Sequence, residues 1–191
     1  MIKPLTWLGL IACAVMAAGA EPPDKPHTFV DLKGASHAPL DAKGVKAVVL
    51  FFVTHDCPIA NYYAAEINAI VKDHAAKPLR FFIVHVDPDL TAAAAADHAK
   101  SYGFTGPVLL DAKHRLVKAT GATITPEAAV LTPDGQIAYR GRIDDLYVDL
   151  GKRRVAPNQR DLRDALAALL AGKPVKEART KAIGCPVPPL R

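Results

Sequence analysis

The chain has little that would link it to nucleic acid, to a membrane bundle or to a fibrous protein. Its 24 Lys and Arg and 19 Asp and Glu leave a net charge of +5, but the basic residues form no block, so no nucleic-acid partner is expected. Of its residues 50% are hydrophobic and 23% charged, with 12 Gly and 16 Pro. This balance excludes disordered, collagen-like and polytopic membrane classes. No repeat or linker divides the chain, so one domain is expected.

The first twenty residues resemble a secretory signal peptide. A short positive start at residues 1–3 precedes an apolar run at 5–17 and small residues at 18–20. The run is short for a membrane span and is followed at once by breaker-rich sequence. We therefore expect residues 1–20 to be removed, leaving an exported, periplasmic protein without a stable membrane span. A retained N-terminal anchor and a lipid anchor on Cys13, which follows Leu-Ile-Ala as in a lipobox, remain alternatives.

The middle of the chain has the pattern of two buried strands joined by a helix. Residues 47–53 and 79–86 are apolar runs of strand length, rich in β-branched and aromatic residues, as in buried parallel strands. Between them, apolar residues from Ile59 to His74 recur at helical spacing and stop before Pro78. A strand, a crossover helix and a parallel strand are therefore predicted.

The rest of the chain completes an α/β domain. The further expected elements are a helix at 91–101, a strand at 107–110, a helix at 113–119, an antiparallel hairpin of 128–131 and 136–140 around an Asp-Gly turn, and a helix at 159–170. This order predicts a domain over 21–172, with a mixed central sheet and helices on both faces. The Pro-rich tail, 173–191, is expected to be flexible and non-helical, and long enough to reach back over the domain.

Cys57 is the first candidate for chemistry. It lies between the end of the first apolar strand and the first turn of the helix, where open α/β sheets place reactive groups. A thiolate there faces unpaired amides and the positive end of the helix dipole, which stabilise it by about 0.3–1 kcal/mol. Protonated His55 would add to this effect and Asp56 would oppose it. A buried structural cysteine is the alternative, but the strand-to-helix position favours a reactive one.

Several features between Phe29 and Leu170 occur together: the strand order, the Cys-Pro helix start, an Ile-Thr-Pro segment before the hairpin, and the Asp-Gly turn. The sequence also contains the stretches CPIANYYAAEI, TPEAAVLTPDGQIAYRGRIDD and, near the C-terminus, GCPV. Together they resemble the thioredoxin-like superfamily, and within it the redoxins, peroxiredoxin-like proteins of the alkyl hydroperoxide reductase and thiol-specific antioxidant type. The resemblance implies a thioredoxin-like fold and an exported thiol oxidoreductase without a bound cofactor. Its partners would be a protein or small-molecule disulfide, or a peroxide, and an external dithiol reductant.

Two departures from the family patterns bear on the activity. Ala60 stands where a C-x-x-C pair has its second cysteine. The peroxiredoxin pattern P-x-x-x-T-x-x-C is matched at Thr54, but Leu50 occupies the proline position. The resemblance also puts Pro126 where peroxiredoxins carry a peroxide-polarising arginine, and Pro126 looks instead like the cis-proline beside a thioredoxin-like reactive cysteine. An extended edge beside a thiolate favours docking of a peptide strand, while peroxidase activity stays open.

Cys185, in the tail, is the candidate partner of Cys57. A bond between them would be either a static disulfide or a catalytic one, in which Cys185 resolves an oxidised Cys57; only geometry distinguishes these. We favour the redox-active pair, because a structural disulfide makes no use of the strand-end position of Cys57. Two further candidates are Arg142, as a guanidinium near the thiolate, and Asp144, as a proton acceptor for exchange. A solvated Arg–Asp turn is the alternative for both.

A metal site is the rival interpretation. His55 lies two residues before Cys57, and His85 ends the neighbouring parallel strand at the same edge of the sheet. If the three converge, one thiolate and two imidazoles would suit copper or zinc. A redox-inactive binding module that uses the cleft around Pro126 is a third hypothesis, because a fold does not determine its function.

Overall fold

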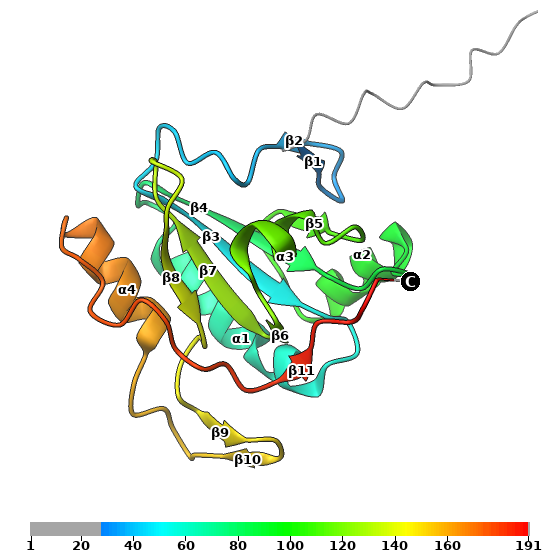
Figure 1. Ribbon diagram of the computed structural model, residues 1–191. Coiled ribbons are helices and arrows are strands. Elements are labelled where there is room, and N and C mark those ends of the chain that lie inside the picture. The colour runs from blue at the N-terminus through cyan, green and yellow to red at the C-terminus, as the bar shows by residue number, and fades with distance from the viewer. Residues whose placement is uncertain (1–27, 191) are drawn as a thin grey trace, which may run out of the picture.

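A five-stranded sheet in the order β5-β4-β3-β7-β8 forms the centre of the domain (Figure 1). The computed structural model describes residues 28–190, so the predicted signal peptide and Cys13 lie outside the described residues. Pairing is parallel between β3 and its neighbour β4 and between β4 and β5, and antiparallel for β3 with β7 and β7 with β8. The predicted mixed sheet is confirmed. The strands are β3 (Ala47–Val53), β4 (Leu79–His85), β5 (Val108–Leu110), β7 (Glu127–Leu131) and β8 (Ile137–Gly141).

The central strand β3 separates two apolar clusters because successive side chains of a strand point to opposite faces. Val49 and Phe51 face the cluster that holds the apolar residues of α1 and α4, whereas Leu50 and Phe52 face the cluster that holds Leu116 of α3. All seven residues of β3 are buried. The helices are α1 (Pro58–Asp73), α2 (Ala92–Ser101), α3 (Arg115–Thr120) and α4 (Asp161–Leu170). Helices therefore cover both faces, as predicted.

Helix α1 follows β3 after a four-residue loop. Pro58 is well placed in its first turn, because the missing amide hydrogen is unpaired there in any residue. Ile59, Tyr63, Ile67 and Ile70 recur at helical spacing and are buried against the sheet. Among residues 28–190 no helix is long and apolar enough to cross a membrane.

Three two-stranded ribbons lie outside the central sheet. Their strands are short and carry no alternating apolar pattern, which is why the sequence did not indicate them. They pair β1 (Phe29–Val30) with β2 (Ser36–His37), β9 (Tyr147–Asp149) with β10 (Lys152–Arg153), and β6 (Ile124–Thr125) with β11 (Cys185–Pro186).

The C-terminal segment is held against the domain rather than loosely attached. We call residues 178–187 the strap (Figure 1). The amide of Arg140 in β8 donates to the carbonyl of Ala178 at 3.0 Å, and the amide of Thr180 donates to the carbonyl of Arg140 at 3.2 Å. Farther along, β11 pairs with β6. The tail was expected to be flexible, but this part of it is paired with the domain. The reason is that β8 is an edge strand, and its free backbone groups can pair with an extended segment.

Candidate active site

Cys57 is the N-cap of α1 and is only 1% exposed. Its Sγ accepts a hydrogen bond from the amide of Ala60 at 3.4 Å, the bond that an N-cap side chain makes to the first turn. The thiol also donates to the carbonyl oxygen of Thr125 at 3.2 Å. The sulfur thus lies at the N-terminus of α1, between the amide of Ala60 and the carbonyl of Thr125.

Cys185 lies directly beside Cys57. The antiparallel pairing of β11 with β6 sets Cys185 opposite Thr125, the residue whose carbonyl contacts the Cys57 thiol. Burial, followed by the hydrogen bond and the charge of the Cys57 sulfur, raises the pKa of Cys185 to about 12. Both cysteines are free thiols in this structure. The pair therefore consists of a buried sulfur at a helix N-terminus and a partner thiol that stays protonated near neutral pH.

Strand β6 connects the two cysteines. The Oγ1 of Thr125 lies 3.1 Å from the Oγ1 of Thr54 and donates to the carbonyl of Cys185 at 3.4 Å. Thr125 is fully buried and Thr54 is 2% exposed. The next peptide bond, Thr125–Pro126, is cis, as the resemblance implies. Both predicted residues therefore lie next to the cysteine pair. Thr54 contacts Thr125, and Pro126 is the residue that follows Thr125.

The segment before Pro126 is fixed by Glu127, which the sequence did not single out. Its buried carboxylate accepts the amides of Thr123 at 2.8 Å and Ile124 at 3.2 Å, and pairs with the guanidinium of Arg140 at 3.3 Å. Arg140 also donates to the carbonyls of Thr120 and Gly121. The ion pair thus joins β6 to β8 and to the end of α3. A charged residue at the start of an apolar strand is the only sequence signal that would have pointed to Glu127.

Arg142 and Asp144 have other partners than Cys57. The guanidinium of Arg142 binds Asp161 at 2.8 and 3.1 Å and Gln159 at 2.6 Å. The carboxylate of Asp144 accepts from the Tyr63 hydroxyl at 2.5 Å, and burial raises the pKa of Asp144 above its ordinary value. Neither has a described contact with Cys57, so the structure does not bring these two candidates to the thiol.

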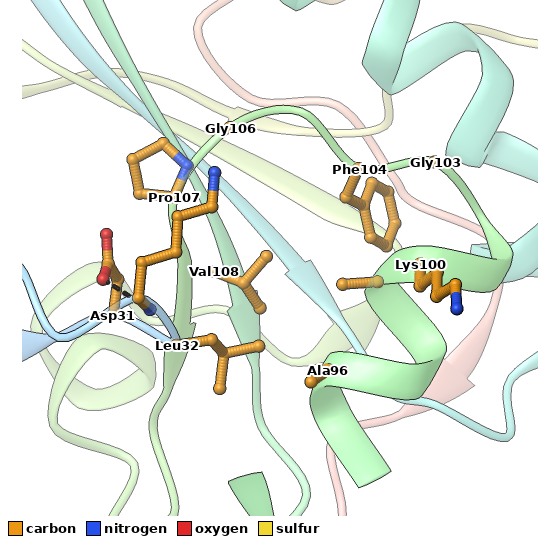
Figure 2. A pocket seen from close by; sticks show the side chains of 11 residues that line it. Asp31, Leu32, Ala96, Lys100, Gly103, Phe104, Gly106, Pro107 and Val108 are labelled. Atoms are coloured by element: carbon orange, nitrogen blue, oxygen red, sulfur yellow. Dashed lines mark hydrogen bonds between the residues drawn. The ribbon is translucent and has the colours of Figure 1, made fainter. Parts of the chain in front are cut away.

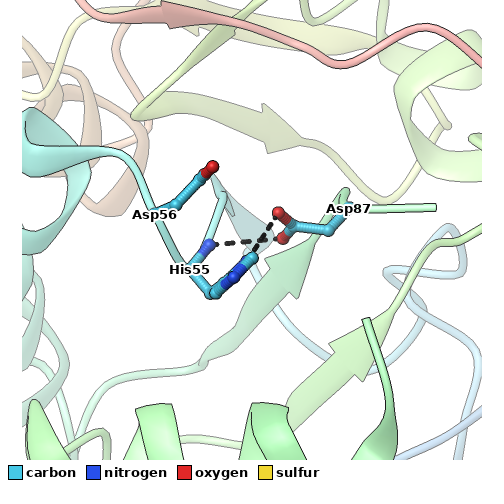
Figure 3. Close-up of side chains that lie close together, drawn as sticks. All are labelled: His55, Asp56 and Asp87. Carbon is cyan, nitrogen blue, oxygen red and sulfur yellow. Dashed lines mark hydrogen bonds and ion pairs between the residues drawn. The ribbon is translucent and has the colours of Figure 1, made fainter. Parts of the chain in front are cut away.

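His55, His85 and Asp87 form a polar network beside the Cys57 loop, and Figure 3 shows the contact of His55 with Asp87. Asp87 follows β4 and accepts from the ring of His55 at 2.9 Å and from the His55 amide at 3.3 Å. The Nδ1 of the fully buried His85 lies 3.4 Å from Oδ2 of Asp87, the oxygen that also accepts the His55 amide. Burial tends to raise the pKa of Asp87, but the bonds from His85 and His55 outweigh it and hold that pKa below its ordinary value. The network fixes the backbone just before Cys57.

The predicted metal set of His55, Cys57 and His85 does not converge. Among residues 28–190, the one group of three ligand atoms close enough to share an ion is His55, Asp56 and Asp87. The sulfur of Cys57 points instead toward Thr125 and the first turn of α1. The thiolate that would have favoured copper or zinc is thus missing from the group, and its His55 and Asp87 are already bonded to each other.

A family model described as Redoxin matches residues 17–147. The chain belongs to the Redoxin family. No curated protein matches the chain significantly. Thioredoxin-like oxidoreductase is the functional class that this membership supports.

Solved structures similar to this Redoxin family chain share its fold. An uncharacterized conserved protein from Geobacillus kaustophilus is 26% identical, with a TM-score of 0.72 over 84% of this chain and 86% of that one. A hypothetical protein from Sinorhizobium meliloti has the same identity and TM-score over 84% and 88%. A secreted Mycobacterium tuberculosis disulfide oxidoreductase homologous to E. coli DsbE is 19% identical, with a TM-score of 0.51 over 78% and 98%. The predicted thioredoxin-like fold is confirmed.

A hollow of about 360 Å³ lies elsewhere on the molecule (Figure 2). It is lined mainly by apolar residues between α2, β5 and the segment after β1, among them Leu32, Ala96, Phe104 and Val108. None of the residues that line it belongs to the cysteine site. This hollow is therefore separate from the cysteine site.

Proposed function

We propose that the protein is an exported, periplasmic thiol–disulfide oxidoreductase with Cys57 as the nucleophile and Cys185 as the resolving thiol. The observation that carries the proposal is the pairing of β11 with β6, which holds the Cys185 thiol against Cys57. A helix N-terminus and an amide donor beside Cys57 suit the attacking role. A protonated thiol next to it suits the resolving role, since it does not compete with Cys57 as the first nucleophile.

The proposed cycle moves two electrons from the protein to a client disulfide. The Cys57 thiolate attacks one client sulfur, so that a Cys57–client disulfide forms and the other client sulfur leaves as a thiol. The Cys185 sulfur then loses its proton and attacks Cys57. A Cys57–Cys185 disulfide forms and the second client thiol leaves with a proton. The client is reduced, the protein is oxidised, and an external dithiol returns it to its starting state.

Disulfide exchange fits the site better than peroxide reduction. Peroxide chemistry needs a positive donor aimed at the leaving oxygen, and the two candidate guanidinium groups pair with carboxylates instead: Arg140 with Glu127 and Arg142 with Asp161. Thr54, the residue shared with the peroxiredoxin pattern, is bonded to Thr125. A disulfide-bonded polypeptide can pair its main chain with the backbone edge next to the thiol, as in strand addition.

Export is proposed from the sequence of the N-terminus. A positive start, an apolar run and small residues precede Glu21. The similar disulfide oxidoreductase from M. tuberculosis is described as secreted. Two free cysteines that form a reversible disulfide suit an oxidising compartment with a dedicated reductant.

Mass spectrometry with alkylated free thiols tests the proposal. After a stoichiometric small disulfide, we expect the mature protein to lose both alkylation sites together, and Cys185→Ser to accumulate a mixed disulfide on Cys57. Cys57→Ser, the matched control, should keep Cys185 free. A Cys57 that neither a disulfide nor a peroxide modifies would contradict the proposal and leave the redox-inactive binding module. Peroxide reaction no faster than that of a small thiol would remove only the peroxidase activity.

A further inference from the structure

The strap is bound to the active-site edge as a substrate strand would be. Cys185 and Pro186 pair antiparallel with Thr125 and Ile124, and the amide of Val187 donates to the carbonyl of Thr123 at 2.9 Å. The bound segment therefore presents its own cysteine to Cys57 through main-chain pairing. Main-chain pairing gives affinity in strand addition, and pockets for individual side chains give specificity.

We infer that residues 184–187 are an internal competitor for this edge, and that the client is an extended polypeptide segment of the pattern Gly-Cys-x-apolar that must displace them. The inference rests on the proposed function for the disulfide exchange itself. The Gly-Cys-x-apolar pattern rests on the contacts that the strap makes. The client, like the strap, would run antiparallel to β6 with its cysteine opposite Thr125.

The glycine of the pattern comes from a close approach of two backbones. Gly184 is buried, and a Cβ added to it would overlap the carbonyl group of Thr125. That carbonyl cannot move freely, because the same oxygen accepts the Cys57 thiol. Any side chain before the cysteine would thus push the segment away from β6. A client must offer glycine at this position for the same reason that the strap does.

The two positions after the cysteine differ in how much they are enclosed. Pro186 is exposed, so many side chains fit there. Val187 is partly buried and packs against the apolar cluster that contains Leu50 and Phe52. An apolar side chain at the Val187 position therefore gains burial that a polar one would not.

A second anchor lets residues 184–187 leave the edge without loss of the whole strap. The hydroxyl of Thr180 lies 2.7 Å from that of Tyr139 and accepts the amide of Arg142 at 3.1 Å. A side chain on Gly141 would overlap Thr180, so the two backbones are close there as well. Because Thr180 stays bound, the released segment remains at a high effective concentration near the edge. When the segment returns, Cys185 attacks Cys57 in the mixed disulfide, the Cys57–Cys185 disulfide forms and the second client sulfur leaves as a thiol. The returning residues 184–187 then occupy the edge that the client has left.

A peptide that cannot exchange disulfides tests the inference. The probe is a labelled synthetic peptide with the sequence of residues 182–189 and serine in place of the cysteine, and its binding to the mature protein is followed by fluorescence anisotropy. Gly184→Ala removes the fit of the strap to Thr125, and Val187→Pro removes the amide that donates to Thr123. Both should bind the peptide at least about tenfold more tightly than the wild type. Pro189→Ala, an exposed change in the same tail, is the matched control and should bind like the wild type.

The outcomes separate this inference from the proposed function. Variants with wild-type circular dichroism that bind the peptide no better than the wild type, or not at all, would overturn the inference even if Cys57 proves redox-active. A peptide with alanine in place of the glycine should not bind; if it binds equally well, the glycine requirement is wrong. Because serine forms no disulfide, strap-dependent binding would stand even if Cys57 reacted with no oxidant.

Discussion

The two cysteines are held in contrasting ways. Cys57 is placed by the junction of a seven-residue central strand and a sixteen-residue helix, both packed into the core. Cys185 is placed by a two-residue strand that pairs with another two-residue strand outside the central sheet. Long buried elements open only when the whole domain unfolds, whereas short peripheral ones open locally. The difference teaches that Cys57 is fixed by the core whereas the segment that carries Cys185 can open locally, as the proposed exchange cycle requires.

The largest effect should separate the two sulfurs by chemistry. Cys57→Ser removes the proposed attacking group, so we expect the rate of disulfide reduction to fall by at least about 10³-fold, to the uncatalysed level. Cys185→Ser leaves the first attack intact and blocks resolution, so a first turnover should occur and then stop in a mixed disulfide. Single-turnover and steady-state assays with the same disulfide measure both. Equal loss of the first turnover in the two variants would contradict the assigned roles.

Stability should separate the elements that hold the sulfurs. Phe51 is fully buried in β3, and Phe51→Ala should lower the free energy of unfolding by about 3–5 kcal/mol through lost burial and the cavity left behind. Val187 is only partly buried, and Val187→Ala should cost no more than about 1 kcal/mol. Urea denaturation with a common slope measures both. Similar losses would show that the strap is part of the cooperative core.

Glu127 offers a smaller test, because it supports the edge that both cysteines share. Glu127→Gln keeps the shape but replaces a buried carboxylate that accepts two amides and pairs with Arg140, so a loss of about 2 kcal/mol is expected. Alkylation of Cys185 in the native protein should also become faster. Glu66→Gln, in the more exposed pairs with Arg160 and Arg163, is the control and should cost less than about 1 kcal/mol. A larger effect at Glu66 would contradict this ranking.

The sequence predicted the regions that hydrophobic patterning controls. The first strand was predicted at its observed bounds, Ala47–Val53, and the crossover helix within a residue or two of Pro58–Asp73. Cys57 followed from these, because its position depends only on where the strand ends and the helix begins. Long buried runs determine their own structure, and little else is needed to place a residue at their junction.

The environment of Cys185 was not predictable in the same way. Its position depends on pairing between residues 124–125 and 185–186, which lie about sixty positions apart and have no periodic pattern. The close approach at Gly184 and the buried Glu127 are consequences of that pairing and of tertiary packing. The proposed metal set failed for a related reason: the sequence places His55 and Cys57 near each other but does not determine which way the sulfur points.

The smallest expected effect concerns His98, which supports the Cys57 loop through Asn61. Burial, followed by the charges of His85 and His55, lowers the pKa of His98 to about 4, from an ordinary value of 6.5. Between pH 6.5 and 4, His98 is therefore protonated in the unfolded chain but mostly neutral in the folded protein. The free energy of unfolding falls as the pH drops through this range. Between pH 6.5 and 5 this amounts to about 1.5 kcal/mol.

His98→Gln should remove that slope. His98 bonds to Asn61, which in turn donates to the carbonyl of His55, so the variant tests the support of the Cys57 loop and leaves β6 and the strap untouched. Urea denaturation at several pH values measures the slope, with His74→Gln at the end of α1 as the control that should retain it. The variant is expected to be less stable than the wild type at pH 6.5 through lost packing, but its stability should change less on acidification. A slope unchanged from the wild type would mean that the buried histidine is not the group that takes up the proton. The acid sensitivity would then have to come from elsewhere in the domain, and the fixed position of Cys57 would not depend on a neutral His98.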